Sequence, residues 1–303
     1  MSKKIILLFG PTASGKSKLA IDIAEEFNGE IINADSMQVY KEIKILSSRP
    51  DKNKIKHHFY GFISAKKNFS VGEWYKLVSK EIKKIQKRKK VPVIIGGTGL
   101  YFRALTEGLV QIPKVKKLDF SHLIPSERYM MINQYQKKNS KIFQGINKND
   151  IQRISRAISV YEGTGLTLNE WQNKENKKYF KSKDFIKLCL SPPKNDLEKK
   201  IKKRFSQMLK KGALQEVRKY KKTFFKHSSH ISANSIIGIY EISLYQNKSI
   251  NLKELKERVL IKTRQYAKRQ YTWQRGQMKD WKVFDDINYL DLRKKILSYL
   301  SKT

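Results

Sequence analysis

A glycine-rich segment near the beginning of the chain has the residue spacing of a phosphate-binding loop. It reads Gly10-Pro11-Thr12-Ala13-Ser14-Gly15-Lys16-Ser17 and fits the pattern G-x-x-x-x-G-K-[ST]. Glycines let backbone N–H groups converge on phosphate oxygens, Lys16 adds a positive charge, and the Ser17 hydroxyl is of the kind that holds Mg²⁺. The apolar run 5–9 precedes the segment and a helical pattern follows it, which is the context the motif needs. We therefore predict that these eight residues bind phosphate groups.

One acidic residue, Asp35, is the candidate general base beside that loop. It follows a second predicted strand, residues 30–34, at the strand end where ligands of open α/β sheets bind. A third predicted strand, residues 91–95, has no acid at its end and continues into Gly96-Gly97-Thr98-Gly99. The acid that holds Mg²⁺ in a phosphate-loop ATPase is therefore missing there, which leaves Asp35 available for proton transfer. An isolated Asp is also typical of a turn, but the pairing with the phosphate loop favours catalysis.

The charge of the chain indicates a polyanionic partner. Its 303 residues include 65 Lys and Arg against 27 Asp and Glu, which gives a formal net charge of +38. Such a charge attracts nucleic acids, although heavy use of Lys through a coding bias would also produce part of it. Because no apolar stretch has the length of a membrane span or the form of a signal peptide, we expect a cytoplasmic protein without a membrane partner. The single cysteine, Cys189, is interpreted as a core residue.

Short apolar runs that alternate with helical patterns predict the fold. The runs at residues 5–9, 30–34, 91–95 and 185–190 are read as strands of one parallel sheet. From about residue 112 to residue 183, helical patterns rich in Lys and Asn replace the strand signals. We therefore predict an α/β fold: a P-loop NTPase-like parallel sheet core, residues 1–112 and 184–303, with an inserted all-helical lobe, residues 113–183.

Two basic segments are candidates for a nucleic-acid interface. Arg153 and Arg156 lie three residues apart in a predicted helix of the lobe and can share a face toward phosphates, although a solvated helix face has the same pattern. The second segment is Lys268-Arg269-Gln270-Tyr271-Thr272-Trp273-Gln274-Arg275. It interleaves basic and aromatic residues, which is typical of contacts to unstacked bases and phosphates. The paired histidines His57 and His58 have no matching metal-ligand partners, and we interpret them as structural.

Several motifs together resemble those of bacterial tRNA dimethylallyltransferases. The phosphate loop is followed by Asp35-Ser36-Met37-Gln38-Val39-Tyr40. Further matching blocks are His57-His58 and residues 69–73, 96–101, 152–157 and 264–270. These blocks follow the order of the family and cover most of the chain.

The resemblance implies a reaction and its participants. N6 of the adenosine on the 3′ side of a tRNA anticodon would attack C1 of dimethylallyl diphosphate and release diphosphate, in tRNAs that read codons starting with U. The partners would be tRNA and dimethylallyl diphosphate, and the cofactor would be Mg²⁺ at Ser17. We expect the enzyme to be a monomer. Asp35 and Thr98 would be catalytic, and residues 10–17 would bind the diphosphate. The residues expected to contact tRNA are Asp35, Ser36, Met37, Gln38, Thr98, Gln152, Arg153, Ile154, Ser155, Arg156, Lys268, Arg269, Gln270, Trp273 and Arg275.

Two other function classes stay open on the residues alone. A small-molecule kinase of the P-loop type would use the inserted lobe as a lid over its acceptor. A basic nucleic-acid-binding module with a non-catalytic nucleotide site would need no base at Asp35. The net charge and the matching blocks disfavour the kinase.

Overall fold

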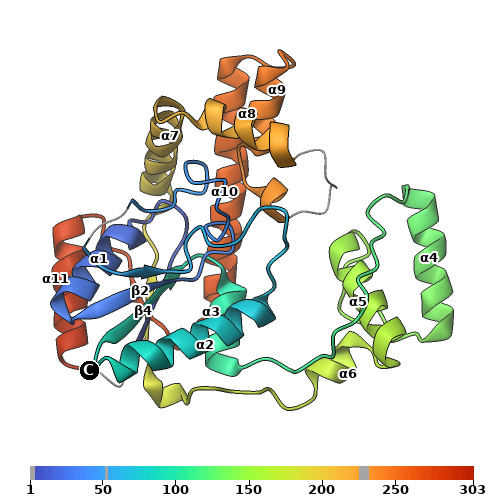
Figure 1. The fold of residues 1–303 in the computed structure, drawn as a ribbon, viewed down its shortest axis with the longest axis horizontal. Coiled ribbons are helices and arrows are strands. Elements are labelled where there is room, and N and C mark those ends of the chain that lie inside the picture. The colour runs from blue at the N-terminus through green and yellow to red at the C-terminus, as the bar shows by residue number, and fades with distance from the viewer. Residues whose placement is uncertain (1–3, 52–53, 225–231) are drawn as a thin grey trace. The chain divides into compact units, whose positions relative to one another are not determined.

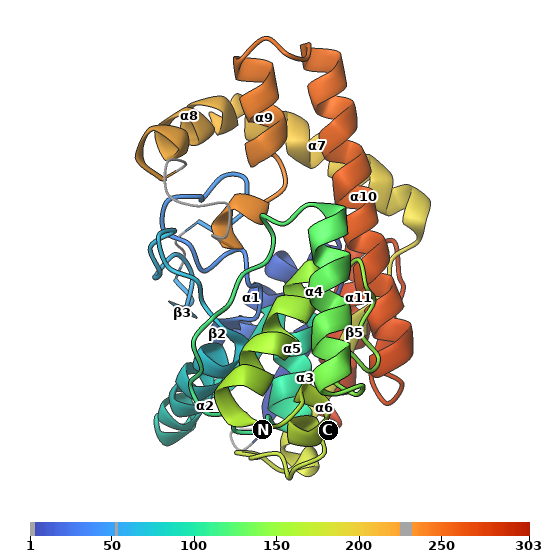
Figure 2. The same ribbon diagram turned by 90° about the vertical axis from the view of Figure 1, so that its right-hand side faces the viewer.

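The computed structural model describes residues 4–51, 54–224 and 232–303. The chain divides into two compact units, which are drawn in Figures 1 and 2. The core unit spans Met1–Thr106 and Phe180–Thr303, and the lobe unit spans Glu107–Tyr179. An antiparallel bridge between Leu109 and Lys177 joins the two ends of the lobe unit. The bounds of the lobe unit differ slightly from the 113–183 expected from the helical patterns.

The core unit contains the parallel sheet that the apolar runs predict. Within the described residues, six strands follow the order β3-β2-β4-β1-β5-β6, and each neighbouring pair is parallel. The strands are β1 (Ile5–Phe9), β2 (Gly29–Asn33), β3 (His57–His58), β4 (Val91–Gly96), β5 (Phe185–Leu190) and β6 (Lys282–Phe284). The predicted α/β class is thereby confirmed. The short edge strands β3 and β6 were not predicted from the sequence.

Continuous burial explains why the central strands are uninterrupted apolar runs. Every residue of β1, β2 and β4 is buried, as expected for parallel strands covered on both faces. In the register of the sheet, Leu8 of β1 lies opposite Ile95 of β4 and Leu188 of β5. The carboxyl ends of β1, β2 and β4 therefore meet at one edge, where the phosphate loop, Asp35 and Thr98 each begin a connection.

Helices cover both faces of the sheet (Figure 1). On one face, α1 (Lys16–Glu26) and α11 (Tyr289–Ser301) pack their apolar residues against alternate strand residues such as Ile6 and Leu8. On the other face lie α2 (Val71–Lys87) and α3 (Gly99–Glu107), where Trp74 donates a 2.9 Å hydrogen bond to the carbonyl of Asn33. The N-cap residue of helix α2 is Ser70, whose side chain and backbone form a capping box with Glu73.

Four further helices of the core unit pack together beyond the carboxyl edge of the sheet (Figures 1 and 2). They are α7 (Lys194–Lys210), α8 (Ala213–Phe224), α9 (Ile239–Gln246) and α10 (Leu252–Gln277). Two 3₁₀ turns, η1 (Ser182–Asp184) and η2 (Ser232–Ser235), precede β5 and α9. The four helices share an apolar cluster, which also includes Val39, Tyr40 and Leu46 from the segment that follows β2. These helices therefore pack against the segment that carries Asp35.

The lobe unit is built from helices α4 (Pro125–Lys138), α5 (Ile151–Thr164) and α6 (Leu168–Gln172). Its core contains Ile132, Phe143 and Ile158. The N-cap residue of α5 is Asp150, whose side chain accepts a hydrogen bond from the backbone N–H of Arg153. Across the described parts of both units, no helix combines the length and apolarity needed to span a membrane.

Candidate active site

The phosphate loop connects β1 to α1 and is exposed at Gly15 and Ser17, where α1 begins. Gly15 has φ of 90°, and a Cβ placed on it would have no atom within 4 Å, so the loop is open at the start of α1. The Lys16 ammonium turns back and donates a 2.6 Å hydrogen bond to the carbonyl of Pro11. Gly10 lies so close to β5 that a Cβ would approach the Cβ of Leu190 to 3.0 Å. These contacts support a cradle formed by the loop backbone and the N-terminus of α1.

Lys16 is a partly desolvated charge. Burial lowers its pKa to about 8, the nearby charge of Asp35 opposes that shift, and Arg204 adds to it. An anion beside Nζ would favour the charged form again. Lys16 is therefore suited to compensate negative charge on a bound phosphate group.

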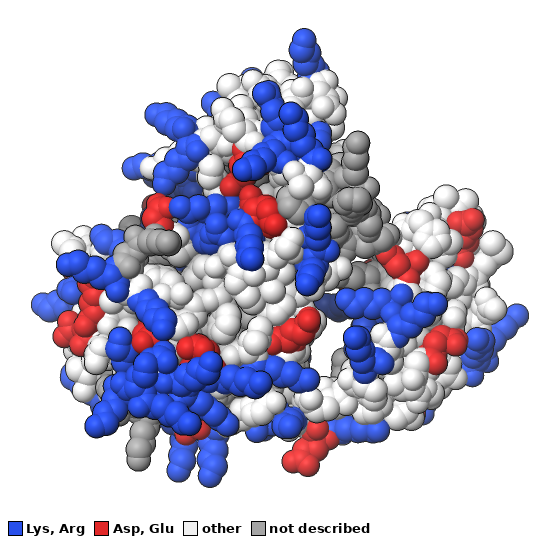
Figure 3. Space-filling model, in the orientation of Figure 1, with Lys and Arg blue, Asp and Glu red and all other residues white. Residues whose placement is uncertain are grey.

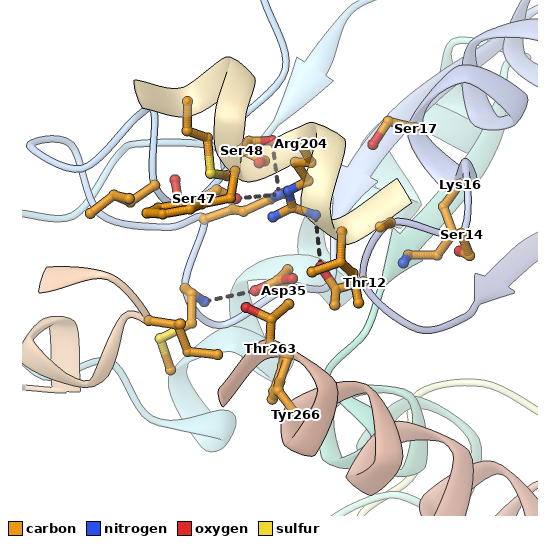
Figure 4. Close-up of a pocket in the computed structure, with 18 of the residues that line it drawn as sticks. Thr12, Ser14, Lys16, Ser17, Asp35, Ser47, Ser48, Arg204, Thr263 and Tyr266 are labelled. Carbon is orange, nitrogen blue, oxygen red and sulfur yellow. Dashed lines mark hydrogen bonds between the residues drawn. The ribbon is translucent and has the colours of Figure 1, made fainter. Parts of the chain in front are cut away.

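A cavity of about 580 Å³ lies beside the loop within the core unit. Its polar side combines residues 12–18 with Asp35, Gln38, Arg204, Thr263, Tyr266 and Arg269. Its apolar side includes Met37, Leu46, Ile201, Phe205, Met208, Ile236 and Val259. Figure 4 shows Asp35 among the loop, α7 and α10, with the guanidinium of Arg204 directed at Thr12. The cavity could therefore hold a ligand with a charged end and an apolar end.

Asp35 is held with its carboxylate in this cavity. Its Oδ1 accepts a hydrogen bond from the N–H of Met37 at 2.9 Å. The side chain of Asn33 accepts from the N–H of Asp35 at 2.9 Å and donates to its carbonyl at 3.0 Å. Among the described residues Oδ2 has no hydrogen-bond partner. One carboxylate oxygen is thus fixed, and the other is available to accept a proton.

Thr98 links the connections that follow β2 and β4. Its Oγ1 accepts a hydrogen bond from the N–H of Ser36 at 3.0 Å and lies 3.2 Å from the Ser36 hydroxyl. The approach is so close that a Cβ on Gly96 would overlap the carbonyl of Ala34. The structure therefore brings Thr98 next to the Asp35 segment, although Thr98 is not among the residues that line the cavity.

Arg204 of α7 is a site residue that the sequence analysis missed. Its Nη1 donates a 2.7 Å hydrogen bond to Oγ1 of Thr12, so it places a second positive charge beside the phosphate loop. Burial lowers its pKa, while the charge of Asp35 raises it. A signal was present, because Arg204 lies at helical spacing within the buried stripe of Leu197, Ile201 and Met208.

Tyr266 of α10 lines the cavity, although the sequence analysis did not assign it to the site. Burial and the charge of Asp35 raise its pKa, so the phenol stays a hydrogen-bond donor at neutral pH. The rings of Tyr101 and Tyr271 have structural contacts instead. Tyr101 is buried and stacks on Trp74 with 4.2 Å between ring centroids, and the Tyr271 hydroxyl donates to the carbonyl of Pro192 at 2.5 Å.

The predicted tRNA contacts of the lobe divide into exposed and buried residues. Gln152, Arg153 and Arg156 are exposed on α5, and Arg153 pairs with Asp150 at 3.2 Å. The side chains of Ile154 and Ser155 are 1% and 8% exposed, because they face the core of the lobe unit. They position α5 rather than present side chains to a ligand, and the expectation of side-chain contacts from these two residues is corrected accordingly.

The basic segment of α10 divides in the same way. Lys268, Arg269 and Arg275 are exposed, but Gln270 is 4% exposed and bonded within the core unit. Its side chain is not available to tRNA, which corrects that expectation. Trp273 is half-buried against Gly99, and its indole N–H has no partner among the described residues. Basic side chains are also frequent elsewhere, including a dense group over α2 in Figure 3.

The paired histidines have a structural setting. Nε2 of His58 lies 2.7 Å from Oε2 of buried Glu30, which also pairs with Arg88 at 2.7 Å and Lys90 at 3.4 Å. Cys189 is buried and unpaired. Among the described residues, no group of three or more His, Cys, Asp or Glu could hold a metal ion by itself.

A parallel sheet with a loop of this spacing between β1 and α1 defines an α/β protein of the P-loop class. The family model described as IPP transferase matches residues 38–277. The chain is 45% identical to a tRNA dimethylallyltransferase of Pelagibacter ubique, with 97% of this chain and 95% of that protein covered. The chain belongs to the IPP transferase family, which confirms the predicted resemblance.

Solved structures agree with this assignment. A eukaryotic dimethylallyltransferase acting on tRNA is similar with a TM-score of 0.80 and 27% identity, covering 97% of this chain and 77% of that one. A tRNA isopentenylpyrophosphate transferase from Staphylococcus epidermidis has a TM-score of 0.68 and 28% identity, with 99% of both chains covered. The phosphate loop and Asp35 precede the range that the family model matches, so their proposed roles rest on the geometry described above.

Proposed function

We propose that this chain transfers a dimethylallyl group from dimethylallyl diphosphate to N6 of an adenosine in tRNA and releases diphosphate. The observation that carries the proposal is one cavity lined by residues 12–17 of the phosphate loop, by cationic side chains that include Lys16 and Arg204, by the Asp35 carboxylate and by apolar residues. The names of the relatives, tRNA dimethylallyltransferases, support the same reaction. We further propose that the adenosine lies on the 3′ side of the anticodon, in tRNAs that read codons starting with U.

The diphosphate end of the donor would lie against residues 10–17. As the bond between C1 and the diphosphate oxygen breaks, the electron pair leaves with the diphosphate. The growing negative charge is stabilised by the loop N–H groups, by the N-terminus of α1, and by Lys16 and Arg204. Because these groups are held in place before the reaction, little reorganisation is required as the charge develops.

The dimethylallyl end needs apolar surroundings. Phe205 and Met208 of α7 and Val259 of α10 are among the apolar residues that line the cavity and could supply them. Burying an apolar tail there favours binding by about 25 cal/mol for each Å² removed from water. The donor would thus be oriented with C1 between the charged and the apolar sides.

Asp35 would act as the general base. The N6 amine is barely acidic in the free nucleoside, but it becomes acidic as the new bond to C1 forms. The unpaired Oδ2 of Asp35 can then accept the proton, while the bond from Met37 to Oδ1 keeps the carboxylate oriented. The base must leave the stack of the anticodon loop to reach this position.

The residues fit a bound Mg²⁺ at Ser17, which is on the exposed first turn of α1 and lines the cavity. Mg²⁺ in phosphate sites commonly takes few protein ligands and completes its shell with phosphate oxygens and waters. This suits a cavity that offers the Ser17 hydroxyl and no ready-made acidic cluster among the described residues. When bound, the ion would neutralise charge on the diphosphate.

We propose that tRNA is held by exposed basic residues of both units, Arg153 and Arg156 on α5 and Lys268, Arg269 and Arg275 on α10. Ser36, Met37 and Gln38 lie beside Asp35, where they could contact the target nucleotide. The chain would act as a monomer, because one copy supplies all the lining of the cavity. It would act in the cytoplasm, where its tRNA substrate is found.

The test is incubation with tRNA and either dimethylallyl diphosphate or ATP, followed by mass spectrometry of the nucleosides and assay of released phosphate. We expect prenylated adenosine only with dimethylallyl diphosphate and no tRNA-stimulated ATP turnover. Steady ATP turnover would favour the kinase or ATPase alternative, and absence of product with both donors would favour a binding module.

A further inference from the structure

A buried amide joins the phosphate loop to the connection after β4. Gln270 of α10 is 4% exposed. Its Oε1 accepts a 2.9 Å hydrogen bond from the N–H of Thr12, and its Nε2 donates a 2.9 Å hydrogen bond to the carbonyl of Gly97. One side chain on α10 thus connects the loops that follow two neighbouring strands.

The two bonds explain the residue types at both ends. Only one orientation of the amide satisfies both partners. In a flipped amide, the NH₂ group would face the N–H of Thr12 and the oxygen would face the carbonyl of Gly97. A carboxylate at position 270 would face the Gly97 carbonyl with negative charge, and an apolar side chain would satisfy neither partner. Any Cβ on Gly97 would overlap Nε2 of Gln270, so glycine leaves the room that the amide occupies.

The first half of the phosphate loop depends on such outside support. Ala13 has φ of 63°, a left-handed conformation that is unfavourable for a non-glycine residue and persists only when its surroundings hold it. Its neighbour Thr12 is held at the backbone by Gln270 and at the side chain by Arg204. Ala13 itself packs against the apolar cluster of α7 and α10 that includes Ile201 and Ala267.

We propose that Gln270 is a positioning residue for the transfer reaction: it fixes the Thr12–Ala13 half of the phosphate loop so that the following N–H groups and Lys16 meet the diphosphate. It acts through the loop and does not touch the substrate. This inference rests on the proposed function, because it assumes that the loop binds the donor diphosphate.

The test compares Gln270→Leu and Gln270→Glu with a matched control, Gln274→Leu. Gln274 lies one turn further along α10 and is also buried, at 6% exposed, and its Oε1 has no partner among the described residues. Binding of inorganic diphosphate with Mg²⁺ is measured by calorimetry, together with KM for dimethylallyl diphosphate, tRNA affinity and the thermal midpoint. We expect Gln270→Leu to weaken diphosphate binding and raise this KM by about 10- to 100-fold, because two buried groups lose their partner. We expect tRNA affinity to be retained and Gln274→Leu to bind diphosphate normally.

Gln270→Glu adds a second measurement, the pH dependence of diphosphate affinity, which a general loss of stability would not change. Once protonated, its carboxyl group can accept from Thr12 and donate to Gly97 as the amide does. Its diphosphate affinity relative to the unaltered chain should therefore recover as the pH falls. Equal binding by Gln270→Leu and the unaltered chain, or equal losses in Gln270→Leu and Gln274→Leu, would overturn the role of Gln270 alone. Failure of the unaltered chain to bind diphosphate would instead overturn the phosphate site and the proposed function.

Discussion

Raising the pH from 7 to 9 tests the electrostatics of the phosphate loop. Burial lowers the pKa of Lys16 to about 8 in the free chain, and a diphosphate beside Nζ should raise it again. Binding would then take up a proton at Lys16. With only the charged form binding well, the charged fraction falls from about nine-tenths at pH 7 to about one-tenth at pH 9. The affinity for dimethylallyl diphosphate should therefore fall about tenfold across this range.

Calorimetry without tRNA measures this effect directly, because titrations in buffers of different ionisation enthalpy count the protons taken up. About half a proton should be taken up per donor bound at pH 8. Lys16→Arg is the matched control, since its guanidinium stays charged throughout the range and should remove the pH dependence. The donor itself changes little, because the last ionisation of its terminal phosphate falls near pH 6. An unchanged affinity in the unaltered chain, or the same decline in Lys16→Arg, would refute the reasoning.

Two further perturbations probe the lobe unit and the edge of the sheet. Replacing Arg153 and Arg156 together with Ala should reduce the slope of log affinity for tRNA against log salt by about one to two units, measured by filter binding, while the single-turnover rate at saturating tRNA survives. An unchanged slope would show that Arg153 and Arg156 are exposed to solvent and do not contact tRNA phosphates. Although burial opposes ionisation of Glu30, hydrogen bonds from Arg88 and His58 hold its pKa at about 2. This group should therefore contribute about 3 kcal/mol of stability above pH 4.5 that is lost as the pH falls toward 2, and Glu30→Gln should remove a similar amount in urea unfolding at pH 7. Equal stability of Glu30→Gln and the unaltered chain at pH 7 would contradict the stabilising role of the ion pairs of Glu30.

The parts of the fold that could be predicted from the sequence depend on local signals. Strand β1 and the phosphate loop were predicted because a buried parallel strand is a continuous apolar run and the loop has fixed glycine spacing. Strand β6 was missed because it has three residues, of which only Phe284 is buried. An edge strand of this length leaves almost no hydrophobic pattern in the sequence.

The site residues that were missed or misassigned depend on tertiary contacts. Gln270 lies in a basic and aromatic segment, and only the packing of α10 shows that its amide points inward to Thr12. Arg204 is one basic residue among the many of α7, and its role follows from the fold that brings α7 beside the phosphate loop. Ile154 and Ser155 belong to a matching block, but the helical period turns them into the lobe core.

The single-turnover rate of Asp35→Asn tests the central claim most directly. Asn can still accept the hydrogen bond from Met37 at Oδ1, so the geometry of the connection is retained while the carboxylate is lost. With enzyme, tRNA and dimethylallyl diphosphate at saturating concentrations, we expect prenylation to slow by about two to four orders of magnitude, the range for loss of a positioned base. The affinities for tRNA and donor should stay close to those of the unaltered chain. A rate near that of the unaltered chain would contradict the account and remove Asp35 from the chemistry.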